Sequence, residues 1–255
     1  MLIDTHTHYD EERFDPDRHE IIQKAHDEGV SLMVNVSNSM DSAGISVRLS
    51  VEYDFIHAAV GLHPYFADEL NDVNLSILHE LAKNEKVVAI GEIGLDYHYM
   101  PHTRQVQKEC FAQLMELAVG LNLPVMIHDR EAHQDVYDMM VRYHARDVGG
   151  IMHSYSGSVE MARRYLDLGF HLSFAGPVTY LNARRIIEVV KYAPMDRILV
   201  ETDCPDLSPE PHRGTRNDST RLRLVAARIA EIKGLSFDAV SAATTENAKR
   251  LLRMP

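Results

Sequence analysis

The strongest constraint on the fold is an alternation of short apolar, β-branched segments with segments of helical spacing along the whole chain. Segments such as Val87-Val88-Ala89-Ile90 are apolar at every position. That composition suits a parallel strand buried on both faces better than a half-exposed antiparallel one. We therefore expect eight strands, at residues 2–6, 32–36, 55–60, 87–92, 125–128, 151–153, 172–174 and 198–201.

Between these strands, apolar residues recur at helical intervals. Examples are Ile21, Ile22 and Ala25, followed by the segments 75–82 and 111–118, and the chain closes on helical patterns at 222–232 and 239–252. Strand followed by helix, repeated eight times, predicts an α/β fold built as a (β/α)8 TIM barrel, with a doubly wound open sheet as the alternative. No linker interrupts the alternation, so we expect one domain over residues 1–255.

Charge and cysteine content narrow the functional classes. The chain has 26 Lys and Arg against 38 Asp and Glu, a net charge of −12, which disfavours a broad basic surface for nucleic acid. A local cationic pocket or a bound metal remains compatible with that charge. With two cysteines, no basic and apolar leader, and no apolar run approaching about 18 residues, we expect a cytoplasmic protein without a membrane segment.

The 15 histidines direct attention to metal chemistry, because histidine is the commonest metal ligand. His6 and His8 lie two apart at the end of the first expected strand, so their imidazoles share a face. On its own this pair fits two hydrogen-bonded surface histidines equally well. Other residues of ligand type follow at further strand ends, namely Glu92, His128, His153 and Asp203.

In an α/β barrel the carboxyl ends of the strands form one ring, where catalytic sites are found. Four histidines and two carboxylates suit borderline divalent metals such as zinc or manganese. A single catalytic zinc uses about three protein ligands, so six predict two ions about 3.5–4 Å apart with one bridging carboxylate. We expect Glu92 to be that bridge. Asp203 is the expected catalytic base, binding one metal and taking the proton of the attacking water.

Motifs over essentially the whole chain resemble the TatD-type metal-dependent hydrolases of the amidohydrolase superfamily. The matching segments are Asp4-Thr5-His6-Thr7-His8, Gly61-Leu62-His63-Pro64, Gly91-Glu92-Ile93-Gly94-Leu95-Asp96-Tyr97, residues 124–130, His153-Ser154-Tyr155-Ser156-Gly157-Ser158, Val200-Glu201-Thr202-Asp203, and Arg213-Gly214 before Asn217. This resemblance implies a metal-dependent hydrolase barrel that holds one metal with His6, His8, Glu92 and Asp203 and the other with Glu92, His128 and His153. It also implies a deoxyribonuclease with 3′-to-5′ exonuclease behaviour, using Zn, Mn, Mg or Co.

The chain departs from the family pattern in its loops, at Ser154-Tyr155, Asp206, Tyr65 and Ser219. None of these positions is an expected metal ligand. They lie in the substrate-facing loops, so they bear on the choice of substrate and not on metal-dependent hydrolysis itself. A small-molecule amide or ester hydrolase is therefore the alternative enzyme. A barrel that only binds a ligand is disfavoured, because all six ligand positions are intact.

Three further residues are candidates for substrate binding. His63 follows the third expected strand, and we expect it to contact substrate or to orient a ligand rather than to bind metal. Arg130 and Arg213 are expected to hold phosphate, because a guanidinium offers two parallel donors to phosphate oxygens. Asp96 is expected to orient a ligand histidine or a substrate group. The expected partner is DNA or another phosphodiester held locally, with no obligate protein partner.

Overall fold

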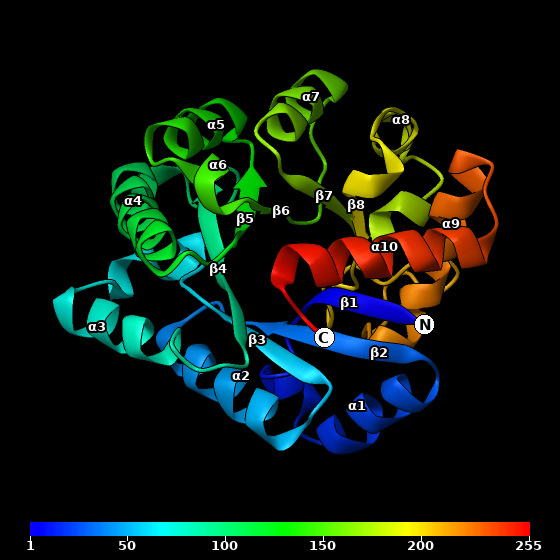
Figure 1. Ribbon diagram of the computed structural model, residues 1–255, viewed down its shortest axis with the longest axis horizontal. Coiled ribbons are helices and arrows are strands. Elements are labelled where there is room, and N and C mark those ends of the chain that lie inside the picture. The colour runs from blue at the N-terminus through cyan, green and yellow to red at the C-terminus, as the bar shows by residue number, and fades with distance from the viewer.

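The computed structural model describes residues 1–255, apart from the side chain of Pro101. Eight strands form one parallel sheet in the order β1 to β8, and an isolated bridge between Thr7 and Cys204 joins its two edges. The expected barrel is confirmed (Figure 1). The strands are β1 (Leu2–Thr7), β2 (Val30–Val36), β3 (Ile56–Val60), β4 (Val87–Asp96), β5 (Val125–Arg130), β6 (Gly150–Met152), β7 (His171–Phe174) and β8 (Ile198–Val200).

Helices follow the strands and surround the barrel (Figure 1). They are α1 (Arg18–Asp27), α2 (Met40–Glu52), α3 (Asp72–Leu81), α4 (Arg104–Leu121), α5 (His133–Arg142), α6 (Ala145–Val148), α7 (Val159–Asp167), α8 (Arg184–Tyr192), α9 (Leu222–Lys233) and α10 (Phe237–Leu252). Helix α3 begins at Asp72, earlier than its apolar pattern indicates, because the Asn71 side chain accepts hydrogen bonds from the backbone N–H groups of Val73 and Asn74. Among the described helices, none has the length and apolarity to cross a membrane.

One sequence expectation about the strands is wrong. Glu92 does not close β4, which runs on to Asp96 and pairs with β5 through Gly94 and His128. The continuation requires a glycine, because a Cβ at Gly94 would lie 2.0 Å from the carbonyl oxygen of His128. Gly94 thus permits close strand pairing where its sequence suggests a loop.

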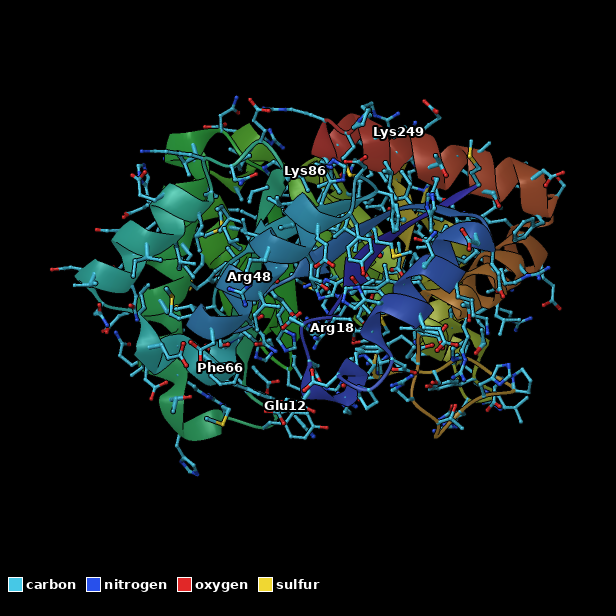
Figure 2. All side chains as sticks on the ribbon, turned by 90° about the horizontal axis from the view of Figure 1, so that it is seen from below. Glu12, Arg18, Arg48, Phe66, Lys86 and Lys249 are labelled. Carbon is cyan, nitrogen blue, oxygen red and sulfur yellow. The ribbon has the colours of Figure 1, made fainter. Side chains whose placement is uncertain are left out.

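The two ends of the barrel differ in character. At the end where the strands begin, Ala248 and Leu252 of α10 pack on the interior residues Ile3, Val34 and Ala59. Figure 2 shows Lys249 of α10 and Lys86 on this side, with Phe66 and Glu12 at the opposite side. Phe66 and Glu12 belong to short 3-10 helices that follow β3 and β1, so they mark the end where the strands finish. At that end, the loops that follow the strands supply the side chains around the opening of the barrel.

His171 of β7 is a buried histidine that should make the stability of the protein depend on pH. It lies two residues before Ser173, whose hydroxyl reaches Thr5 across the barrel, and both its ring nitrogens are buried without a hydrogen-bond partner. Burial, helped by Arg197 and Arg250 and opposed by Asp196, lowers the pKa of His171 from 6.5 to about 4. Because the unfolded chain binds the proton more tightly, this residue's contribution to stability is present above pH 6.5 and is lost toward pH 4.

We expect the free energy of unfolding to fall by about 2 kcal/mol between pH 7 and 4.5 through this group alone. In the variant His171→Gln that part of the decline should disappear. The measurement is urea unfolding of both proteins in EDTA at the two pH values, so that metal loss does not contribute. His79→Gln, on an exposed histidine of α3, is the control. An unchanged pH dependence in His171→Gln would contradict the expectation.

Candidate metal centre

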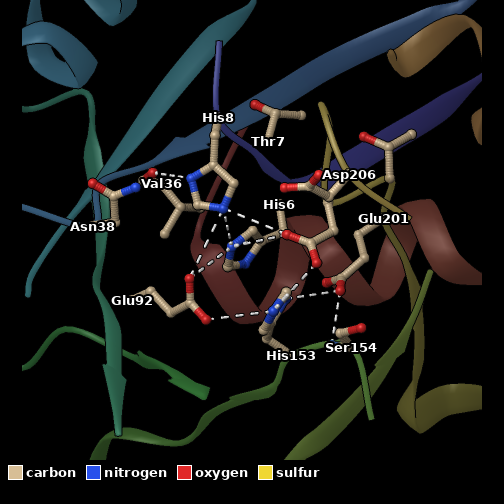
Figure 3. A network of polar contacts seen from close by, with 12 residues as sticks. His6, Thr7, His8, Val36, Asn38, Glu92, His153, Ser154, Glu201 and Asp206 are labelled. Atoms are coloured by element: carbon tan, nitrogen blue, oxygen red, sulfur yellow. Dashed lines mark hydrogen bonds and ion pairs between the residues drawn. The ribbon is translucent and has the colours of Figure 1, made fainter. Parts of the chain in front are cut away.

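The two histidines of the first motif converge, as their spacing predicts. His6 lies in β1 and His8 directly after it, and the Nε2 atoms of the two rings are 3.2 Å apart. On its other side, the ring of His6 stacks on that of His153, with 3.7 Å between the ring centres. Figure 3 shows His6 between His8 and His153. Three imidazoles from two separate strand ends therefore meet at one point.

Glu92 connects this group to the histidines on the other side. One carboxylate oxygen, Oε2, lies 3.4 Å from His6 Nε2 and 3.9 Å from His8 Nε2. The other, Oε1, lies 2.8 Å from His128 Nδ1 and 3.4 Å from His153 Nε2. The two oxygens thus face different sets of histidines (Figure 3), which is the arrangement that a bridging carboxylate needs.

Asp203 completes the ring of donors. It lies three residues beyond β8, with Oδ1 3.4 Å from His8 Nε2 and Oδ2 3.8 Å from His153 Nε2. Its backbone N–H donates to the His6 carbonyl oxygen. The structure therefore brings together all six side chains that the sequence indicated as ligands. Their nitrogens and carboxylate oxygens face one another, and this donor set fits divalent cations.

Neighbouring acceptors orient the histidine rings. His8 Nδ1 lies 2.8 Å from the Val36 carbonyl oxygen, and His128 Nε2 lies 3.2 Å from Asp96 Oδ2. His153 Nδ1 lies 2.8 Å from Glu201 Oε1. Such contacts fix the ring and leave the other nitrogen to bind a metal. Asp96 stands where an orienting residue is expected.

Sequence reasoning did not assign roles to Glu201 and Asp4, although both lie inside matched motifs. Glu201 is fully buried at the end of β8 and accepts from the backbone N–H of Ser154. Asp4 accepts from the backbone and side chain of Thr202, at 2.9 and 2.6 Å, and from the Ser219 hydroxyl. Asp4 thereby holds the residue directly before Asp203. The signal was available, since a carboxylate within or directly after a buried strand is rare without a partner.

Charges within the cluster shift its pKa values strongly. Burial alone would raise the pKa values of Glu92 and Asp203, but the surrounding histidines, His153 foremost, hold both well below their usual range. Burial alone would lower the pKa of His8, and Asp203 instead raises it to about 10. Asp96 and Glu92 likewise outweigh burial and raise the pKa of His128 to about 9. Without a metal the two carboxylates are thus charged and are compensated by protonated imidazoles, so cations that bind here displace protons.

The sequence predicts that His63 contacts substrate or orients a ligand, but the residue lies directly beside two of the metal donors. Its Nε2 is 3.3 Å from His128 Nδ1 and 3.9 Å from Glu92 Oε1, and these three residues form one of the groups able to hold a metal. Burial and the neighbouring His128 lower the pKa of His63 to about 3, so the ring is neutral and able to donate an electron pair. The structure thus adds His63 to the residues that could bind metal.

The two arginines are not part of the donor cluster. Arg130 ends β5 and is exposed, with its guanidinium 5.9 Å from the centre of the Tyr99 ring. Arg213, also exposed, lies in the loop after β8, 4.3 Å from the centre of the Tyr180 ring. A cavity of about 240 Å³ opens above the donors. It is lined by His63, Tyr65, Phe66, Glu11, Asn38 and Asp206 together with all the donors except His6.

A parallel barrel whose strand ends present histidines and carboxylates as paired donors defines a class, the metal-dependent hydrolases on the (β/α)8 fold. The model of the family described as TatD related DNase matches residues 3–253. The chain belongs to this family, and the resemblance seen in its motifs is confirmed.

Individual relatives agree with this assignment. The chain is 46% identical over 254 residues to the uncharacterized metal-dependent hydrolase YabD of Bacillus subtilis, covering all of both proteins. It is 36% identical to the uncharacterized metal-dependent hydrolase YcfH of Escherichia coli, over all of this chain and 96% of the relative. Among solved structures, the TatD homologue YjjV of Escherichia coli superposes with a TM-score of 0.94 at 29% identity, covering 100% of this chain and 98% of that one.

Proposed function

We propose that the protein hydrolyses phosphodiester bonds, as a deoxyribonuclease of 3′-to-5′ exonuclease type that uses two divalent ions of Zn, Mn, Mg or Co. The observation that carries this proposal is the Glu92 carboxylate, whose two oxygens face two separate sets of histidines. Paired metal sites of this kind suit displacement at phosphorus, and the name of the matching family indicates DNA. His6, His8, Glu92 and Asp203 would hold one ion, and Glu92, His128 and His153 the other.

Bound cations would lower the pKa of a coordinated water, polarise the phosphoryl oxygen and offset charge on the leaving oxygen. Side chains of the protein accept the proton and position the reacting groups. Asp203 accepts the proton of the attacking water at a carboxylate oxygen that faces the cavity. Asp4 and Thr202 keep that carboxylate in place. His63 lies beside Glu92 and His128, on the side where a phosphate oxygen would enter.

Local cations, rather than net charge, would hold the polyanion. The described structure gives Arg130 and Arg213 no carboxylate partner within 4.0 Å, so both guanidinium groups are free to bind phosphate. Arg13, by contrast, is bound by Glu11 and Asp206. The net charge of −12 repels a long stretch of DNA, but two local guanidinium groups can still bind the phosphates at one end of a strand.

The acidic rim favours one alternative, the hydrolysis of a small amide or ester. Glu11 and Asp206 both line the cavity, and each accepts hydrogen bonds from Arg13, so the entrance carries two carboxylates for one guanidinium. A neutral substrate would enter past this rim without repulsion. Labelled single-stranded DNA and a panel of N-acyl compounds, offered to the same metal-loaded protein, distinguish the two activities.

Removing the metals should abolish turnover. The donors retain only protons after treatment with EDTA, and the side chains alone do not offset charge at phosphorus. We expect phosphodiesterase activity to fall at least about 1,000-fold, which corresponds to the several kcal/mol that such ions supply. Activity should return on adding Mg, Mn, Zn or Co. Full activity in metal-free protein would refute the proposal.

A further inference from the structure

Two tyrosines that the mechanism above does not use lie beside the cavity, next to Arg130. Tyr65 lies in the 3-10 helix Pro64–Glu69, lines the cavity, and stands edge-on to the His63 imidazole with 4.4 Å between ring centres. Tyr99 follows β4 and lies edge-on to Tyr65, 6.2 Å away. The Arg130 guanidinium lies beyond Tyr99 at 5.9 Å. We name these three residues the tyrosine wall.

The wall is exposed but its backbone is anchored. Tyr65 is 39% and Tyr99 61% exposed, so neither ring serves the hydrophobic core. The Tyr99 backbone N–H donates to Asp96 Oδ1, the same carboxylate whose other oxygen faces His128. The backbone N–H of Tyr65 donates to His63 Nδ1. These bonds tie the backbone of both tyrosines to residues of the proposed metal centre, so the two rings project from fixed points beside it.

The chemistry of the wall matches a nucleobase. Exposed aromatic side chains are one means by which proteins hold unpaired bases, because every base offers a flat π-face. Arg130 adds a cation that can reach the phosphate attached to a stacked base. A phosphodiester seated over Glu92 and His63 would bring the base of an adjoining nucleotide toward the tyrosines. Tyr65 is the nearer ring, with its centre 4.4 Å from that of His63, and the centre of the Tyr99 ring lies 6.2 Å from that of Tyr65.

We propose that the tyrosine wall binds the base of the nucleotide next to the scissile phosphate, so that the enzyme requires an unpaired base there. This inference rests on the proposed phosphodiesterase function and names what the same site recognises. Binding through a π-face would be tolerant of base identity but would fail for a nucleotide that lacks its base. The wall would thus act in substrate binding and not in the chemical step.

The test uses two single-stranded oligonucleotides that differ only in whether the nucleotide next to the scissile phosphate, tried on each side, carries a base. For the metal-loaded protein we expect kcat/KM to be about 10-fold lower for the abasic substrate, mostly through KM. In Tyr99→Ala the two substrates should become equivalent, while Tyr99→Phe keeps the preference. Tyr192→Ala, an equally large change at a 46% exposed tyrosine of α8, should behave like the unaltered protein.

Two outcomes would overturn the inference while leaving the proposed function intact. One is equal cleavage of both substrates by the unaltered protein, and the other is a base preference that survives in Tyr99→Ala. If neither oligonucleotide is cleaved, the proposed function itself fails and the wall loses its role with it. Cleavage of aromatic N-acyl compounds in that case would assign the wall to a different substrate.

Discussion

Asp203→Asn is expected to lower phosphodiesterase activity by about 1,000-fold or more, within the range for loss of a general base together with a metal ligand. The amide cannot accept the proton of the attacking water. It also removes the charge that, by its contact with His8 Nε2, raises the pKa of that ring. The fold should survive, because the backbone N–H of this residue keeps its bond to the His6 carbonyl oxygen and Asp4 still holds Thr202.

Asp206→Asn is the matched control. Asp206 lines the same cavity on the same loop, but its carboxylate is paired with Arg13 and not with a histidine. This variant should keep activity within about 3-fold, the scale of an exposed ion pair. Initial rates with metal in excess, together with circular dichroism of each variant, provide the comparison. Near-normal turnover by Asp203→Asn would refute the assignment of the base, and an equal loss in both variants would indicate a general effect of rim charge.

Much of the fold was accessible from sequence because it depends on local pattern. Near-continuous apolar segments such as residues 87–90 suit burial on both faces, and their eightfold alternation with helical patterns leaves few topologies besides the barrel. The same rule placed the six donor side chains at one end, where the structure brings each of them within about 4 Å of at least one other donor. Chain order alone put Glu92 between the two groups of histidines, and its carboxylate does face both.

What the sequence could not predict depends on contacts between distant segments. The extension of β4 to Asp96 follows from a backbone approach at Gly94 that no local pattern encodes. Glu201 and Asp4 act through residues 47 and 198 positions away. The sequence position of His63 indicates a residue that contacts substrate or orients a ligand. The turn after β3, however, brings its Nε2 to 3.3 Å from His128 Nδ1. Arg130 and Arg213 were identified by type, and only the structure shows that each lies over a tyrosine.

Glu92→Gln is expected to lower the metal content from about two ions per chain to about one and to reduce activity about 1,000-fold. The amide has nearly the shape of the carboxylate, but it presents one oxygen and an NH2 group where two anionic oxygens stood. The side facing the amide nitrogen cannot bind a cation. Because the carboxylate is buried among five histidines, nearby water cannot compensate for the loss of its negative charge.

Glu201→Gln gives the sharpest comparison for Glu92, because Glu201 is also buried beside the cluster but has one oxygen near His153 and the Ser154 backbone N–H, and does not face two sets of histidines. Loss of an orienting partner typically weakens a metal about 10- to 100-fold, so this variant should still bind two ions when metal is in excess. Metal content measured after gel filtration, and titration of metal-free protein with Zn or Mn, separate the two cases. If Glu92→Gln retains two tightly bound ions, the carboxylate does not bridge. One ion per chain in the unaltered protein would likewise end the two-metal proposal.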